Sequence, residues 1–127
     1  MTLTPQELDD WATAYIAAEQ LPDNEKHDSP YWWAIERFMD MYDTTQAEDI
    51  WTTILEVLSR RPDQNVIGML AAGPLEDLIK DWGEMFIDRI ELEARRNPAF
   101  RHLLGGVWKG STPEVWARVE KARITSW

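Results

Sequence analysis

Three carboxylates, Glu36, Asp40 and Asp43, have the spacing that comes closest to a catalytic pattern. If the chain is helical here, Glu36 and Asp40 share a face because they are four positions apart, and Asp43 follows three positions later. Such a group could bind a divalent ion or divide acid and base roles between two carboxyls. Arg37 lies in the same stretch, however, and solvated helix faces commonly carry charges of both signs. We therefore expect a solvated face, with a carboxylate- or metal-dependent hydrolase as the alternative.

Other reactive residue types do not form a recognisable site. The two histidines, His27 and His102, lie on different expected elements, whereas helical metal sites place ligands three or four positions apart. We expect His27 to be a solvated linker residue and His102 a partly buried structural one. The chain has no cysteine, which excludes thiol nucleophiles and cysteine-bound zinc. Phosphate-loop, dinucleotide-binding and nucleophile-elbow patterns are also absent from the sequence, so no catalytic residue, cofactor or metal site is predicted.

Trp33 stands apart from the other tryptophans, of which the chain has eight in all. A helical wheel puts it opposite an apolar face made of Tyr31, Ile35, Phe38, Met39 and Tyr42. An exposed tryptophan among charges is typical of an interaction hot spot, and Arg37 at i+4 could stack on it. The alternative is that another helix covers this face. The candidate partner-binding residues are Trp33, Glu36, Arg37, Asp40 and Asp43.

The elements that would position these residues are helices. Helix starts are predicted at Thr4-Pro5-Gln6-Glu7, Ser29-Pro30, Thr45-Gln46-Ala47-Glu48 and Thr112-Pro113, and helix ends at Arg60-Arg61-Pro62, Asn97-Pro98 and Gly105-Gly106. A polar link is expected over 22–28. Gly73 is expected to stop a short helix over 66–72, Pro74 to start the next, and Phe86 and Ile90 to mark a further one. No segment alternates with period two, so no strand is predicted.

A faint repeat relates two parts of the chain. Trp51, Leu55 and Arg60-Arg61 recur 35 positions later as Phe86, Ile90 and Arg95-Arg96. A long and a short helix with a period near 34 residues are typical of HEAT- or TPR-like solenoids, but any antiparallel helix pair gives a similar length. The predicted fold is therefore all-α, a single domain over 1–127 in which about seven or eight helices stack as helical hairpins. Residues 1–29 would supply the N-terminal helix and the polar linker.

Charge is distributed unevenly along the 127 residues. The formal net charge is −10, and residues 1–59 alone hold thirteen acids against two bases. This half would repel nucleic acid and attract a basic partner; simple solubility is the alternative explanation. Ala94–Trp127 carries seven bases and two acids, too weak an excess to propose DNA binding. No apolar run approaches a membrane span and the N-terminus lacks signal-peptide features, so we expect a soluble cytoplasmic protein.

One string of residues carries a family resemblance. The string Ala71-Ala72-Gly73-Pro74-Leu75-Glu76-Asp77-Leu78, together with Tyr31-Trp32-Trp33 and Leu104-Gly105-Gly106-Val107-Trp108, resembles the signature of a bacterial family of small helical proteins of unknown function. The resemblance spans about residues 30–118 and implies a helical domain in a bacterial cell. It implies no activity, cofactor or catalytic residue. Read physically, Gly73 and Pro74 would form a helix–helix corner, and Glu76 and Asp77 would complement the helix dipole there or meet a basic partner.

These observations favour a non-enzymatic protein-interaction domain with an acidic surface for a basic partner. A small acidic protein without catalytic motifs also fits the profile of immunity-type proteins that neutralise a toxin, whose capture electrostatic attraction would speed. The alternatives are the hydrolase that uses Glu36, Asp40 and Asp43, and a homo-oligomeric structural protein. In the last case the basic C-terminal part of one copy would meet the acidic half of another.

Overall fold

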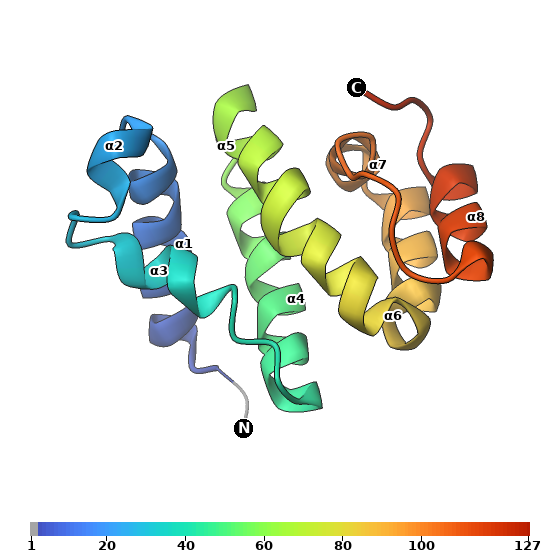
Figure 1. Cartoon of the computed structure of the whole chain (residues 1–127), viewed down its shortest axis with the longest axis horizontal. Coiled ribbons are helices and arrows are strands. Elements are labelled where there is room, and N and C mark those ends of the chain that lie inside the picture. Colours follow the sequence, from blue (N-terminus) through green and yellow to red (C-terminus); the bar gives the residue numbers. More distant parts are fainter. Residues whose placement is uncertain (1–2) are drawn as a thin grey trace. The chain divides into compact units, whose positions relative to one another are not determined.

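The computed structural model describes residues 3–127, which form two compact units, Met1–Met69 and Leu70–Trp127. The described residues contain helices and no strand, which confirms the all-α prediction. The arrangement of helical hairpins stays a prediction. Figure 1 shows the helices in sequence colours, and each unit is treated separately below.

The first unit is built on α1 (Pro5–Glu19), which packs against both α3 (Trp32–Arg37) and α4 (Thr44–Ser59). Between α1 and α3 lies the single turn α2 (Asp23–Lys26), where a polar link without structure was expected. The helix α5 (Gln64–Leu70) follows α4. Buried side chains of α1 and α4, among them Trp11, Tyr15, Ile50 and Ile54, form the core of this unit. Burial of these large apolar groups is the main force that holds the three helices together.

The predicted start of α1 is confirmed in atomic detail. The Thr4 hydroxyl accepts the Glu7 backbone N–H, and the Glu7 carboxylate accepts the Thr4 backbone N–H. The predicted start of α4 is wrong by two residues. Asp43 is the N-cap, because its carboxylate accepts the Gln46 N–H at 2.9 Å, whereas Thr45 already lies inside the helix. Asp43 with Gln46 three positions on is itself a capping pair, and it prevails over the competing pair of Thr45 and Glu48.

The helix expected after Pro30 is much shorter than the pattern suggested. It ends at Arg37, and the next N–H groups, of Phe38, Met39 and Asp40, bond carbonyls only three residues back. This tightening is a usual way for a helix to end. Asp40 and Asp43 therefore lie outside the helix that carries Glu36, and the prediction that Glu36 and Asp40 share a helix face is wrong.

The second unit is organised around one long helix, α6 (Glu76–Arg96), to which α7 (Pro98–Leu104) and α8 (Pro113–Ala122) both pack. Its core contains Phe86, Ile90, Phe100, Leu103 and Val119. The predicted helix start at Thr112-Pro113 is confirmed, since the Thr112 side chain accepts the Val115 N–H. The predicted helix end at Asn97-Pro98 is also confirmed, because α6 ends at Arg96, and the Asn97 side chain in addition caps α7. The helix predicted around Phe86 is the part of α6 beyond Trp82. There the backbone leaves helical values, with φ −131° and ψ 17°, and a kink divides α6 into two helices.

The predicted stop at Gly73 and corner at Pro74 are wrong. Residues Ala71–Leu75 form a π-helical turn, η1, that leads directly into α6 with Pro74 inside it. Proline removes one N–H and crowds the carbonyl four residues back, and the wider π turn relieves both by shifting bonds to five residues. The Glu76 N–H accordingly donates to the Ala71 carbonyl. No described glycine has a positive φ, so Gly73 does not act as a left-handed stop.

Candidate partner-binding surface

The candidate residues lie along residues 31–43 of the first unit, here called the 31–43 segment. It comprises Tyr31, α3 and the chain that leads to the Asp43 cap of α4. Phe38 fixes the segment to α1, because its ring lies 4.7 Å from that of Trp11 and 4.8 Å from that of Tyr15. The buried Trp11 indole also donates to the Ala34 carbonyl at 2.9 Å. Apolar packing and one buried hydrogen bond therefore hold the segment in place while its other side faces solvent.

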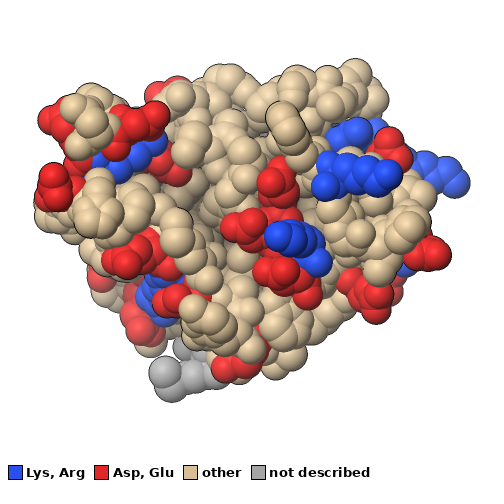
Figure 2. All heavy atoms as spheres, in the orientation of Figure 1, with Lys and Arg blue, Asp and Glu red and all other residues tan. Residues whose placement is uncertain are grey.

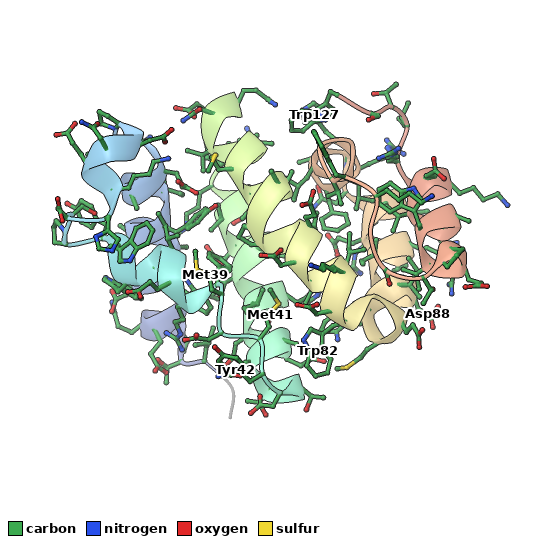
Figure 3. The ribbon with its side chains drawn as sticks, in the orientation of Figure 1. Met39, Met41, Tyr42, Trp82, Asp88 and Trp127 are labelled. Atoms are coloured by element: carbon green, nitrogen blue, oxygen red, sulfur yellow. The ribbon has the colours of Figure 1, made fainter. Side chains whose placement is uncertain are left out.

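Large apolar side chains are exposed along the 31–43 segment. Tyr42 is 81% exposed, Met39 58% and Trp33 41%. Tyr31 is also exposed. Figure 3 shows Met39 at the end of α3 and Tyr42 on the chain before α4. The predicted helix face that joins Met39 and Tyr42 to Phe38 is wrong because α3 stops at Arg37, and Tyr31 precedes the helix. Of the two alternatives for Trp33, the structure shows the exposed one.

Acidic side chains lie between these apolar groups. Glu36, Asp40 and Asp43 are all exposed, and Arg37 is the one base of the segment. In Figure 2 acidic groups gather over the end of this unit that α1, α2 and α3 form. Interleaved acids and aromatic groups match a partner surface that combines basic and apolar side chains.

Arg37 does not stack on Trp33. Its guanidinium lies 4.4 Å from the centre of the Trp11 ring, and it helps to line a small pocket of about 120 Å³. The other lining residues are Trp11, Asp40, Gln46, Asp49 and Ile50. Arg37 and Asp40 thus meet at this pocket, whereas Trp33 and Glu36 do not contribute to its lining. The cation–π contact on a buried ring makes Arg37 part of the fold as well as of the surface.

Asp49 is a member of this pocket that the sequence patterns missed. Burial raises the pKa of its carboxyl, and the nearby Glu7 and Asp43 add to the rise, while Arg37 opposes it. Gln46, on the same helix, accepts the Tyr42 N–H at 2.8 Å and so fixes the chain that carries Asp40 and Tyr42. The competing cap signal at Asp43 and Gln46 would have revealed this arrangement, because it ends the preceding helix early.

In the structure Glu36, Asp40 and Asp43 are not arranged as a catalytic site. Asp43 uses its carboxylate to cap α4, and Glu36 lies on α3. Within residues 3–127 no group of three or more potential ligands lies close enough to hold a metal ion. Over the same range, no helix has the length and apolar character that crossing a membrane needs.

The two histidines have different surroundings. His27 is exposed in the linker, 3.7 Å from Asp28, as expected, and its ring lies 4.9 Å from that of Trp32. His102 was expected to be partly buried, but it is exposed and stacks on Trp127 with the rings 5.0 Å apart. This long-range contact has no periodic signal in the sequence.

The signature residues of the second unit have structural partners. Glu76 accepts the Trp108 backbone N–H at 2.9 Å and so fixes the loop after α7. Asp77 has a raised pKa, because burial and the neighbouring charges of Asp81 and Glu76 disfavour its carboxylate. Neither residue lies at a free helix start, since η1 precedes α6 without a break. The helix-dipole explanation of these two acids is therefore wrong.

A larger hollow of about 640 Å³ lies beside the Trp82 irregularity of α6. Gly83 allows Ser111 to approach α6 closely, because a side-chain carbon at Gly83 would lie 2.7 Å from the Ser111 hydroxyl. Ser111 itself has a left-handed φ of 67°. The walls carry one base and two acids, Lys80, Asp81 and Glu84, a mixture that selects no single ligand charge.

Comparison with known proteins gives one match. Residues 20–127 match the model of DUF6869, described as a family of unknown function. No curated protein and no solved structure gives a significant match.

Proposed function

This chain belongs to the DUF6869 family, whose function is unknown, and we propose that it is a non-enzymatic protein that binds a basic protein partner. The binding surface is the 31–43 segment, with Trp33, Met39 and Tyr42 as apolar contacts. One observation carries the proposal: these side chains are exposed between acids, in the unit that carries the acidic excess of the chain. The proposal retains the bacterial cytoplasm as location and neutralisation of a toxin as one form of the function.

The energetics support an interface at this surface. Few monomers leave several large apolar side chains exposed along one short segment unless another molecule covers them. Aromatic anchors contribute most to binding when acids around them exclude water and pair with the partner's cations. The acidic excess would speed the approach of a basic partner, and salt would weaken that attraction over about 8–10 Å.

A pull-down with paired variants tests the proposal. The tagged chain is used as bait in lysate of the source cells, in parallel with Tyr42→Ala, Glu36→Lys and the control Glu114→Lys, each washed at low and high salt. Glu114 is an exposed acid of the second unit, so its reversal changes net charge as Glu36→Lys does but leaves the segment intact. Tyr42 is a better choice than Trp33 for truncation because it is more exposed, and its loss should change stability by no more than about 0.5 kcal/mol.

The expected result is a basic protein that the unmodified bait and Glu114→Lys retain at low salt. Tyr42→Ala and Glu36→Lys should each lose it, with an affinity loss of about tenfold or more for an anchor at a hot spot. Equal retention by all four baits would refute the role of the segment, and so would equal loss with both charge reversals.

A further inference from the structure

The groove at the end of α7 is occupied by the last residues of the chain. The Trp127 backbone N–H donates to the Gly105 carbonyl at 2.8 Å, and its indole N–H donates to the His102 carbonyl at 2.7 Å. The indole ring stacks on His102 at an angle of 18°. Figure 3 shows Trp127 beside α7. The Gly105 carbonyl lies beyond the last residue of α7, and the His102 carbonyl accepts the indole N–H in addition to the Gly105 N–H, since a carbonyl oxygen has two lone pairs.

Two glycines give the indole its place. Gly105 has φ −64° and ψ −20°, values that any residue adopts, so its conformation does not require glycine. The lack of space is what requires glycine. A side-chain carbon at Gly105 would lie 2.6 Å from the Trp127 ring, and one at Gly106 would lie 2.5 Å from the same ring. The sequence patterns explain these glycines as a helix stop. The structure shows that they also form the floor of a slot for an indole.

The segment that fills the slot lies on the surface of the second unit. Ile124, Thr125, Ser126 and Trp127 are all exposed and belong to no helix. A pocket of about 270 Å³ remains between this segment and α7, lined in part by Arg101, Ile124 and Thr125. Among the described contacts Arg101 makes no ion pair, unlike Arg96, Arg118 and Arg123 of the same unit. The pocket thus has room for a side chain that extends further than Ile124, and Arg101 could pair with an acid on that side chain.

We infer that this groove is a peptide-binding site for a partner segment that carries a tryptophan and, three positions before it, an acidic residue. The tryptophan occupies the slot over Gly105 and Gly106, and the acid pairs with Arg101 in the position that Ile124 holds. In the free chain Trp127 fills the slot in place of the partner. This site lies in the second unit, and the inference does not depend on the proposed function of the 31–43 segment.

Calorimetric titration of full-length chains with short peptides tests the inference. Trp127→Ala empties the slot, and the first probe is the peptide Arg-Ile-Thr-Ser-Trp, the sequence of residues 123–127. The second probe has Glu at the Ile position. The double variant Trp127→Ala with Gly105→Ala is the blocked control, since its added methyl group lies where the indole would be. Circular dichroism establishes that each variant keeps its helices.

Trp127→Ala should bind the first peptide with a Kd on the order of 0.1 mM. The unmodified chain should bind about tenfold more weakly, because its own segment competes at an effective concentration on the order of 1 mM. The Glu peptide should bind about two- to fivefold more tightly at low salt, a gain that Arg101→Ala removes. No saturable binding to Trp127→Ala up to 1 mM would overturn the inference, and so would equal binding to the blocked variant. Failure of the Glu peptide alone to gain affinity would overturn the acidic preference.

Discussion

Replacing Gly105 by alanine should destabilise the unmodified chain and stabilise the Trp127→Ala variant. In the unmodified chain the new methyl group would collide with the Thr125 carbonyl and lie 2.6 Å from the Trp127 ring, so the end of the chain must leave its groove. In Trp127→Ala the segment has no indole anchor and moves away at little cost. There the substitution acts through the unfolded state, because Gly105 already has a conformation that alanine adopts.

The magnitudes follow from the contacts of Trp127. Its two hydrogen bonds contribute about 1 kcal/mol each and the ring stack about 1 kcal/mol. Burial of roughly half an indole, about 100 Å², adds about 2.5 kcal/mol. Ordering four residues at about 1 kcal/mol each offsets most of this sum, which leaves a net docking free energy of about 1–2 kcal/mol. Gly105→Ala should therefore cost about 1 kcal/mol in the unmodified chain and stabilise Trp127→Ala by about 0.5 kcal/mol.

Urea and thermal unfolding of the four chains, followed by circular dichroism, measure this cycle. For 127 residues, 1 kcal/mol corresponds to about 4 °C in Tm, so the two backgrounds should differ by about 6 °C in their response. A coupling of about 1.5 kcal/mol exceeds the 0.3–0.5 kcal/mol by which independent sites depart from additivity. If Gly105→Ala has the same effect in both backgrounds, the indole does not occupy the slot in solution.

Two further substitutions test local features of the two units. Asp77→Asn should raise Tm at pH 7, because burial and the charges of Asp81 and Glu76 raise the pKa of this carboxyl and its ionised form costs stability. The gain should shrink as pH falls through the raised pKa and vanish below the ordinary value of 3.8; a lower Tm at pH 7 would contradict the assignment. Asp43→Ala should cost about 1 kcal/mol, or about 4 °C, through loss of the α4 cap, while Thr45→Ala should change stability by less than about 0.5 kcal/mol. The reverse order would place the cap at Thr45.

Helix starts were predictable from sequence where the signal is local. Thr4 with Glu7, and Thr112 before Pro113, satisfy the free N–H groups of their own helices, so a window of four residues contains the whole interaction. Asp43 was predictable in the same way, but two overlapping capping pairs compete there. The competing pair, Thr45 and Glu48, lets the preceding helix run several residues further. That longer helix reverses the expected exposure of Met39 and Tyr42.

The Gly73-Pro74 step was not predictable from local signals. A glycine followed by proline usually ends one helix and starts another, yet both lie in the π turn before α6. Ala71, Pro74 and Leu75 are buried there, and a side-chain carbon at Gly106 would lie 2.9 Å from that of Ala71. Packing within the second unit therefore favours a widened helical turn over a corner, and no short sequence window contains that packing.

The two candidate sites also differ in whether a short stretch of sequence contains their residues. The acids and Trp33 of the 31–43 segment could be selected from sequence because they lie close together along the chain, whereas the slot joins His102 and Gly105 to a residue more than twenty positions later. The glycines also conceal the slot, because a glycine that ends a helix and a glycine that leaves space for a ring look alike in sequence.

The two proposed surfaces lie in units of different net charge. Met1–Met69 holds fourteen acids and four bases, while Leu70–Trp127 holds nine of each. In the second unit Arg96, Arg118 and Arg123 pair with neighbouring acids, Arg118 with both Asp88 and Glu91. Binding at the 31–43 segment should therefore weaken strongly with salt, whereas an indole in the slot is held by neutral hydrogen bonds and ring contact that salt does not screen. Only the added contribution of an acid at Arg101 should be lost, so one salt series distinguishes the two surfaces on a single chain.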